Sequence, residues 1–138
     1  MPLSDPAAVA AEILRRFRRI AVVGISPDPT RDSHRVARYL LDVGYEILPV
    51  NPRTPRVLGL PCHPCLSDLP PPVEVVDVFR RSELVGPVVD EAIAIGARAV
   101  WMQDGVIDHE AAERARAAGL LVVMDRCMLR DHRAFGSA

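Results

Sequence analysis

The sequence predicts a single α/β domain of the Rossmann-like, doubly wound type, with about five parallel strands and helices on both faces of the sheet. Five short runs are nearly continuous in valine, isoleucine and leucine, which is typical of strands buried on both faces of a parallel sheet. Helical patterns lie between most of these runs, and three of those patterns end at a glycine. The length of 138 residues suits one domain.

In chain order, the first expected element is an N-terminal helix within residues 1–18, with its acid early and its arginines late. This segment has no apolar run long enough for a signal peptide or a membrane span, which predicts a cytoplasmic protein with no membrane partner. The five expected strands follow at residues 20–24, 45–50, 73–79, 97–102 and 120–125.

Three helices are expected after the first, third and fourth of these strands, at residues 33–43, 83–95 and 108–118. Ser33 is suited to cap the first turn of the first of them. Glycine fits the left-handed residue that closes a helix and turns the chain into the next strand. Such a glycine follows each of the three helices, as Gly44, Gly96 and Gly119.

The connection 51–72 is the exception to this alternation. It contains seven of the 13 prolines and too little periodicity for a full helix, although CLSDLP could form one helical turn. Connections of this length without regular structure are uncommon in compact domains. We therefore expect either an irregular crossover or a lid over a ligand.

Basic or amide groups follow most of the predicted strands. Doubly wound sheets bind ligands outside the carboxyl ends of their strands, where the strand order reverses. Arg80 and Arg81 come directly after the strongly apolar run VEVVDVF, which is a poor place for ordinary solvated charges. Hydrogen bonds from arginine to phosphate contribute roughly 1.5–3 kcal/mol each, so these residues would anchor an anionic ligand. The helix beginning near Ser33 directs free backbone N–H groups toward the same space.

The loop after the first strand, GISPDPTRDSHR (24–35), has one glycine where a G-x-G-x-x-G loop has three. An NAD site also uses a carboxylate at the end of the second strand. Here that strand ends in PVNPR, and no acidic residue occurs between Glu46 and Asp68. These differences count against NAD. NADP stays compatible, because Asn51 and Arg53 suit a phosphorylated ribose or an adenine edge.

The overall charge limits the kind of partner. With 17 basic and 18 acidic residues, the formal net charge is -1, whereas a general nucleic-acid binder needs a basic excess. We therefore expect no nucleic-acid partner and a local phosphate site.

The three cysteines, Cys62, Cys65 and Cys127, do not suggest a disulfide framework, because their number is odd. CHPC is a C-x-x-C motif, but redox thiols of this kind lie at a helix N-terminus after a strand, whereas this pair lies in a proline-rich segment. A zinc site would need a second pair of ligands, so no metal is expected. Cys127 is expected to be a small buried thiol or a contact of a bound ligand.

Four segments carry a resemblance to a known family: IAVVGISPDPTRDSHRVARYLLDVGYEILPVNPR, VLGLPCHPCLSDLP, VEVVDVFRRSELVGPVVDEAIAIGARAVWMQDGV and AGLLVVMDRCM. They resemble the small stand-alone CoA-binding proteins, which are similar to the CoA-binding N-terminal domain of the succinyl-CoA synthetase alpha subunit. The resemblance extends over about residues 15–132. It implies a Rossmann-type domain that holds coenzyme A or a short acyl-CoA along the carboxyl edge of the sheet.

The resemblance also implies which residues would surround CoA. The first loop and the following helix start would hold the diphosphate and pantetheine, and the end of the second strand would hold the adenosine. VFRR would form a second phosphate-facing edge, and the last two strand ends would line the thiol arm. Either Arg31 or Arg53 would reach the adenosine phosphate. The residues implied are Gly24, Ile25, Ser26, Arg31, Ser33, His34, Arg35, Val50, Asn51, Pro52, Arg53, Val78, Phe79, Arg80, Arg81, Met102, Gln103 and Cys127.

The catalytic part of the resemblance does not transfer. The synthetase uses a second domain with a phosphorylated histidine and an ATP-grasp partner chain, and 138 residues leave room for neither. We therefore expect a CoA-binding module without catalysis of its own, as a monomer or small homo-oligomer. The alternative is an NADP-dependent or thiol-redox enzyme that uses the same edge or Cys62 and Cys65. A third hypothesis is a regulatory protein that reports CoA status to an unidentified protein partner.

Overall fold

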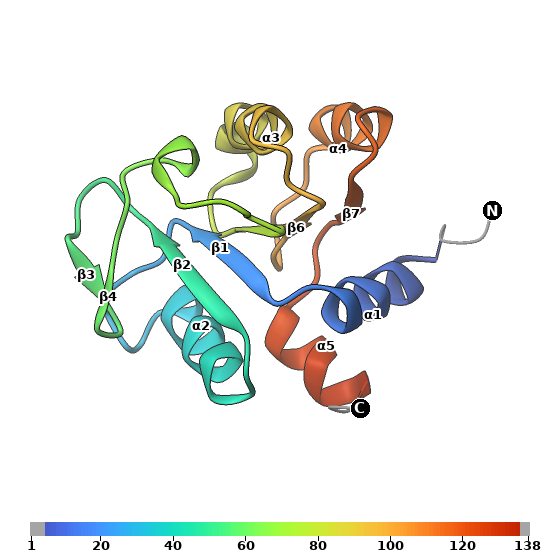
Figure 1. The fold of residues 1–138 in the computed structure, drawn as a ribbon. Coiled ribbons are helices and arrows are strands. Elements are labelled where there is room, and N and C mark those ends of the chain that lie inside the picture. The colour runs from blue at the N-terminus through green and yellow to red at the C-terminus, as the bar shows by residue number, and fades with distance from the viewer. Residues whose placement is uncertain (1–4, 136–138) are drawn as a thin grey trace.

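One parallel sheet of five strands forms the centre of the computed structural model, which describes residues 5–135 (Figure 1). The strand order is β2-β1-β5-β6-β7, and every pairing is parallel. Each strand overlaps one of the expected apolar runs, so the predicted fold class is confirmed. The strands are β1 (Arg19–Val23), β2 (Glu46–Val50), β5 (Val75–Val78), β6 (Ala99–Met102) and β7 (Leu121–Val123).

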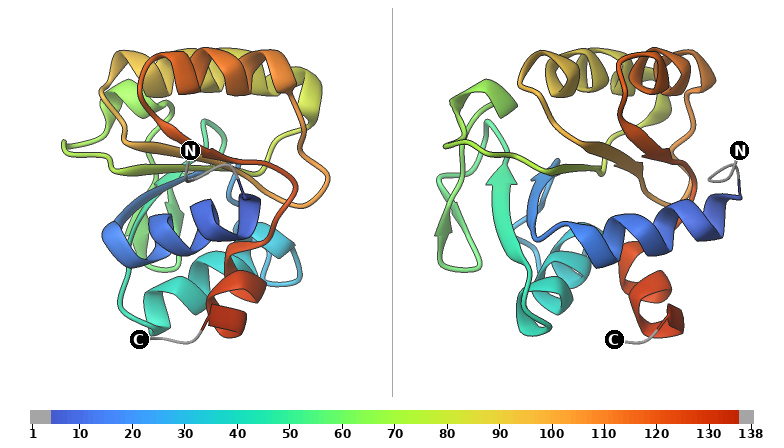
Figure 2. Two further views of the ribbon diagram at one scale, coloured as in Figure 1. Left: turned by 90° about the vertical axis from the view of Figure 1, so that its right-hand side faces the viewer. Right: turned by 45° about the vertical axis from the view of Figure 1, so that its right-hand side comes forward.

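Helices cover both faces of the sheet, as predicted (Figure 2). One face carries α3 (Val85–Ala94) and α4 (His109–Ala117), and the other carries α1 (Pro6–Arg16), α2 (Asp32–Asp42) and α5 (Met128–Phe135). Alternate residues of each strand point into two separate apolar cores. This explains why the strands are apolar at nearly every position and not at every second one.

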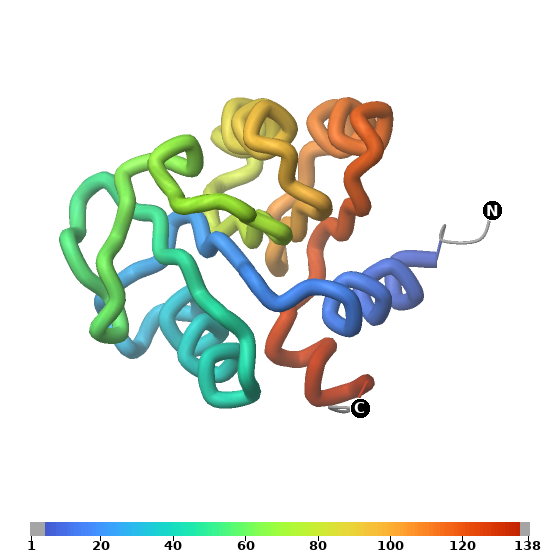
Figure 3. The backbone as a smooth tube through the Cα atoms, in the orientation of Figure 1, coloured from blue at the N-terminus to red at the C-terminus, as the bar shows by residue number. Residues whose placement is uncertain are grey.

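The chain changes from one face of the sheet to the other after β2 and changes back after β7. Figure 3 follows it through α2 on one face, then through α3 and α4 on the other, and back to α5. The three glycines expected to close helices do so with positive φ angles, at Gly44, Gly96 and Gly119.

The connection 51–72 contains short regular elements that its sequence does not reveal. The strands β3 (Arg56–Val57) and β4 (Leu60–Pro61) form an antiparallel pair, and η1 (Leu66–Asp68) is a single 3-10 turn. Leu58 and Gly59 at the hairpin turn both have positive φ angles, as a two-residue type I′ turn requires. The segment runs beside edge strand β2 through a parallel bridge between Val50 and His63.

Helix α5 is not predicted by the sequence pattern, because part of its buried face is polar. Asp131 is 5% exposed and accepts two hydrogen bonds from Arg126, at 2.7 Å to Oδ2 and 3.0 Å to Oδ1. His132 is 8% exposed, and its Nδ1 lies 2.7 Å from the Tyr39 hydroxyl. Within residues 5–135, no helix combines the length and the apolar character that a membrane span needs.

Candidate functional site

The strand order reverses between β1 and β5, so their carboxyl ends open into the crevice where doubly wound sheets bind ligands. The two strand ends meet closely there. Gly24 has a φ of +88°, and a Cβ atom on it would lie 2.4 Å from the Phe79 carbonyl oxygen. Glycine is therefore required both by the backbone conformation and by the approach of the neighbouring chain.

The loop after β1 is fixed by side chains of α2. Ser33 Oγ accepts a hydrogen bond from the Ser26 amide at 3.0 Å. His34 Nδ1 lies 3.0 Å from the Ser26 carbonyl oxygen, so this ring nitrogen carries the proton that is shared. The prediction that Ser33 caps the helix is wrong, because α2 already begins at Asp32, with Arg31 at the N-cap position. Ser33 instead holds the loop in place.

Asn51, which follows β2, supports the same loop from the other side. Its Nδ2 donates to the Ile25 carbonyl oxygen at 2.7 Å, and its Oδ1 accepts from the Arg53 amide at 2.8 Å. Since both ends of this amide are hydrogen-bonded within the protein, Asn51 shapes the loop. The loop therefore has a fixed backbone before any ligand binds.

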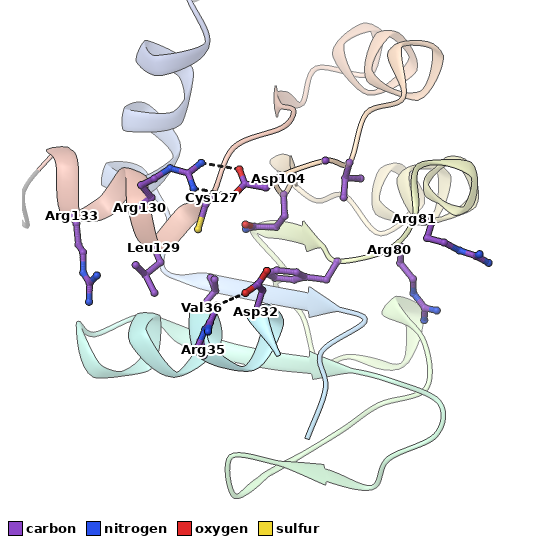
Figure 4. Close-up of a pocket in the computed structure, with 14 residues that line it drawn as sticks. Asp32, Arg35, Val36, Arg80, Arg81, Asp104, Cys127, Leu129, Arg130 and Arg133 are labelled. Carbon is purple, nitrogen blue, oxygen red and sulfur yellow. Dashed lines mark hydrogen bonds and ion pairs between the residues drawn. The ribbon is translucent and has the colours of Figure 1, made fainter. Parts of the chain in front are cut away.

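Two adjacent cavities open at this edge. The smaller one, of about 570 Å³, lies over the loop after β1 and the start of α2. The larger one, of about 940 Å³, lies between α2, the ends of β5 and β6, and α5 (Figure 4). Phe79 and Asp32 line both cavities, which places the two side by side.

The larger cavity combines an apolar interior with arginines at both ends. Figure 4 shows Arg80 and Arg81 at one end and Arg130 and Arg133 at the other, with Cys127 and Leu129 near the second end. Apolar groups and the thiol thus lie between two groups of guanidinium side chains. This arrangement suits an extended molecule with an anionic end and a less polar arm.

The arginines at this edge differ in how they are paired. Arg35 pairs with Asp32. Arg130 donates twice to Asp104, at 2.8 and 2.9 Å, and this holds the pKa of the Asp104 carboxyl below its usual value. In contrast, no carboxylate of residues 5–135 lies within 4.0 Å of the Arg31 or Arg80 guanidinium groups. These two side chains are available to an anionic ligand.

Hydrogen bonds tie the rim of the larger cavity together. Ser82 Oγ accepts from the Ile107 amide at 2.9 Å, which joins the loop after β5 to the loop after β6. The Gly105 amide donates to Asp125 Oδ1 at 2.7 Å, which adds the loop after β7. Trp101 Nε1 donates to the Arg126 carbonyl oxygen at 2.8 Å and so fixes the segment between β7 and α5. The walls of the cavity are therefore defined by the fold.

The predicted site residues fall into three groups. Ile25, Val50, Val78 and Met102 have side chains buried in the two cores, so a ligand could meet only their backbone. His34, Asn51, Pro52 and Arg53 line neither cavity. The remaining predicted residues do line the two cavities: Gly24, Ser26, Arg31, Ser33, Arg35, Phe79, Arg80, Arg81, Gln103 and Cys127.

Several cavity residues were not predicted. Leu129, Arg130 and Arg133 belong to α5, which the sequence pattern did not reveal, and the others follow β1 or β6 or lie in α2. Those others are Thr30, Asp32, Val36, Asp104, Gly105 and Val106.

Asp77 was also missed, although an acid inside the apolar run VEVVDVF is a visible signal. It is fully buried in β5, and its Oδ1 accepts from Gln103 Nε2 at 2.6 Å. Burial raises the pKa of Asp77 to about 8.

The cysteines are all unpaired. Burial raises the pKa of the Cys62 thiol, which reduces its thiolate fraction, and Cys65 donates through its thiol to Asp68 Oδ2 at 3.2 Å. A redox dithiol requires the opposite pKa shift. Among residues 5–135, no three His, Cys, Asp or Glu side chains are grouped so that they could hold a metal ion.

Similarity to known proteins identifies the family of the chain. Residues 18–133 match the family described as CoA binding domain. The chain is 41% identical over 121 residues to "Uncharacterized protein YneT" of Bacillus subtilis (strain 168), covering 88% of this chain and 90% of that protein. It is 43% identical to a solved structure described as "hypothetical protein from Pyrococcus horikoshii OT3", with a TM-score of 0.91 over 99% of this chain and 97% of that one.

A larger protein contains a related region. The dinucleotide-forming acetyl-coenzyme A synthetase 1 of Ca. Korarchaeum cryptofilum is 30% identical, with a TM-score of 0.71. The match covers 80% of this chain but only 26% of the synthetase chain.

Proposed function

The chain belongs to the CoA-binding domain family, and on this basis we propose that it binds coenzyme A or a short acyl-CoA at the carboxyl edge of its sheet. The observation that carries the proposal is the pair of adjacent cavities at the β1/β5 switch point, with a fixed loop at one end and, beside it, two arginines that have no carboxylate partner among residues 5–135. The related region of a synthetase named for acetyl-coenzyme A gives it further support.

In the proposed complex, the phosphates lie over the loop after β1 and the start of α2, where Arg31 and Arg80 neutralise them. The N-terminus of α2 adds its free backbone N–H groups and the positive end of its dipole. The pantetheine arm then runs past Phe79 through the larger cavity toward Cys127. The length of CoA suits two adjacent cavities better than one.

The proposal contains no reaction. The synthetase match covers only about a quarter of that protein, so its activity is not transferred to this chain. The raised pKa of Cys62 gives the thiol-redox alternative no support. A cytoplasmic location, an unidentified protein partner and a monomer or small homo-oligomer stay predictions.

The test is the melting temperature of the protein with CoA, dephospho-CoA, NAD or NADP. CoA at a hundredfold excess over its dissociation constant should stabilise the fold by about 2.7 kcal/mol. Dephospho-CoA should stabilise it less, because one phosphate is missing. The absence of a shift with CoA, or an equal shift with NAD, would contradict the proposal.

A parallel assay separates the enzyme alternative from a binding module. An NADP-dependent enzyme would consume NADPH with a suitable acceptor, and a thiol-redox enzyme would reduce disulfides. Cys62→Ser is the matched variant, because it would abolish disulfide reduction and leave CoA binding unchanged.

A further inference from the structure

Asp77 occupies an unusual place for an acid. It lies in the central strand β5, opposite Val22 of β1 and Trp101 of β6, and is 0% exposed. Burying a carboxyl group costs free energy unless hydrogen bonds compensate. Here Oδ1 has a partner at 2.6 Å in Gln103 Nε2, whereas Oδ2 has none among residues 5–135.

Gln103 connects this buried acid to the larger cavity. It follows β6 directly, is 3% exposed and lines the cavity. Its Nε2 is turned toward Asp77, so its Oε1 is the free end of the amide. No group of residues 5–135 donates to Oε1, and this oxygen is not fully buried. It therefore keeps access to the cavity.

We infer that Asp77 is a positioning residue of the ligand site: it holds the Nε2 of Gln103, so that Gln103 Oε1 faces the cavity as an acceptor for an amide N–H of the ligand arm. This rests on the proposed function, because the pantetheine arm of CoA carries secondary amide groups. A nucleotide without that arm has no such N–H group to offer at this depth. Asp77 therefore contributes to specificity without touching the ligand.

The chemistry of the pair explains which substitutions should matter. Burial favours the neutral carboxyl of Asp77, whose Oδ1 still accepts a hydrogen bond. Asparagine has the same shape and retains that acceptor. Leucine has nearly the same shape but accepts nothing, so Asp77→Leu releases the Gln103 amide, whereas Asp77→Asn holds it.

The first measurement is made on the free protein by ¹⁵N NMR. The side-chain NH₂ signal of Gln103, identified by its loss in Gln103→Leu, should exchange slowly with water in the wild type and in Asp77→Asn. It should exchange much faster in Asp77→Leu. Equal exchange in Asp77→Leu and the wild type would overturn the inference without reference to any ligand.

The second measurement compares CoA with adenosine 3′,5′-bisphosphate, which lacks the pantetheine arm, by calorimetric titration. Asp77→Leu should weaken CoA binding roughly three- to tenfold, as loss of one hydrogen bond does, and leave the bisphosphate within about twofold. Gln103→Leu should reproduce this loss, and the double variant should add nothing further. Asp77→Asn should restore the wild-type affinity.

Val75→Ala is the matched control for a change in the core. Val75 lies two residues earlier on the same face of β5 and is 1% exposed. This variant should melt at a lower temperature and bind CoA with unchanged affinity. Equal weakening of both ligands by Asp77→Leu, or of CoA by Val75→Ala, would assign Asp77 a structural role only. Failure of the wild type to bind CoA would instead contradict the proposed function, and the NMR result would still decide the geometry.

Discussion

The two edges of the sheet differ in how some of their arginines are paired. At the amino edge, Arg19 pairs with Glu46, and Glu74 Oε1 accepts from the Arg18 and Arg19 amides at 2.8 and 2.9 Å. Arg98 lies over the Phe17 ring, 5.6 Å from its centroid. At the carboxyl edge, Arg31 and Arg80 have no carboxylate within 4.0 Å among residues 5–135.

This difference separates structure from function. An arginine with a carboxylate, carbonyl or aromatic partner already has its charge used within the fold. An arginine without such a partner beside a preformed cavity is available to an external anion. The paired arginines of the amino edge should therefore contribute to stability, and Arg31 and Arg80 at the carboxyl edge should contribute to ligand affinity.

The largest loss of stability is expected at Gly24, where the ends of β1 and β5 approach each other closely. Gly24→Ala adds a Cβ atom 2.4 Å from the Phe79 carbonyl oxygen at a φ of +88°. The left-handed conformation and the clash should together lower the stability by roughly 2–5 kcal/mol and move the ends of β1 and β5 apart. Thermal unfolding and CoA titration should both show the loss. An unchanged melting temperature would contradict the close approach of Gly24 to the Phe79 backbone.

Asp77 provides the next test, through pH. Its pKa is raised from an ordinary 3.8 to about 8, so the folded state binds this proton more tightly than the unfolded state does. The stability due to the neutral carboxyl is therefore full below the ordinary pKa and is lost as the pH rises toward about 8. Asp77→Asn should lack this loss. Urea unfolding at pH 5, 7 and 9 measures this change in the free energy of unfolding. The same pH dependence in the wild type and in Asp77→Asn would contradict the raised pKa of buried Asp77.

Glu74, just before the opposite end of β5, should show the reverse dependence. Hydrogen bonds from the Arg19 and Arg18 amides lower its pKa, so its contribution is full above the ordinary glutamate value and is lost as the pH falls through the lowered one. Glu74→Ala leaves two amides without their acceptor and should cost about 2 kcal/mol near pH 7. Chemical unfolding should detect this, with CoA affinity unchanged. A loss of CoA affinity in Glu74→Ala would contradict the claim that the amino edge does not contribute to ligand binding.

The smallest effect is expected at Ser33. Ser33→Ala removes the acceptor of the Ser26 amide, which should cost about 1 kcal/mol and loosen the loop over the smaller cavity. CoA affinity should fall a few-fold, and Ser33→Thr, which retains the hydroxyl, should restore it. Equal CoA affinity of the alanine and threonine variants would show that the Ser33 hydroxyl does not support the loop.

The sequence was sufficient for the five-stranded sheet and for four of the helices, because the strands are apolar on both faces and glycine closes three of the helices. The position of the two cavities could also be predicted, since the carboxyl edge of a doubly wound sheet follows from strand direction alone. The far wall of the larger cavity could not be predicted, because the buried face of α5 is built from Asp131 and His132 as well as apolar residues. The sequence position of Ser33 fits a helix cap, whereas its actual partner, the Ser26 amide, depends on the path of the loop.

The most direct test titrates CoA into two paired variants. Arg31→Gln with Arg80→Gln changes the carboxyl edge, and Arg18→Gln with Arg98→Gln changes the amino edge by the same charge. The carboxyl-edge variant should melt normally and bind CoA more weakly by roughly a hundredfold or more, since each of the two lost charge-assisted hydrogen bonds costs about 1.5–3 kcal/mol. The amino-edge variant should bind CoA with unchanged affinity and melt at a lower temperature. Equal CoA affinity in the two variants would contradict the assignment of the carboxyl edge to CoA.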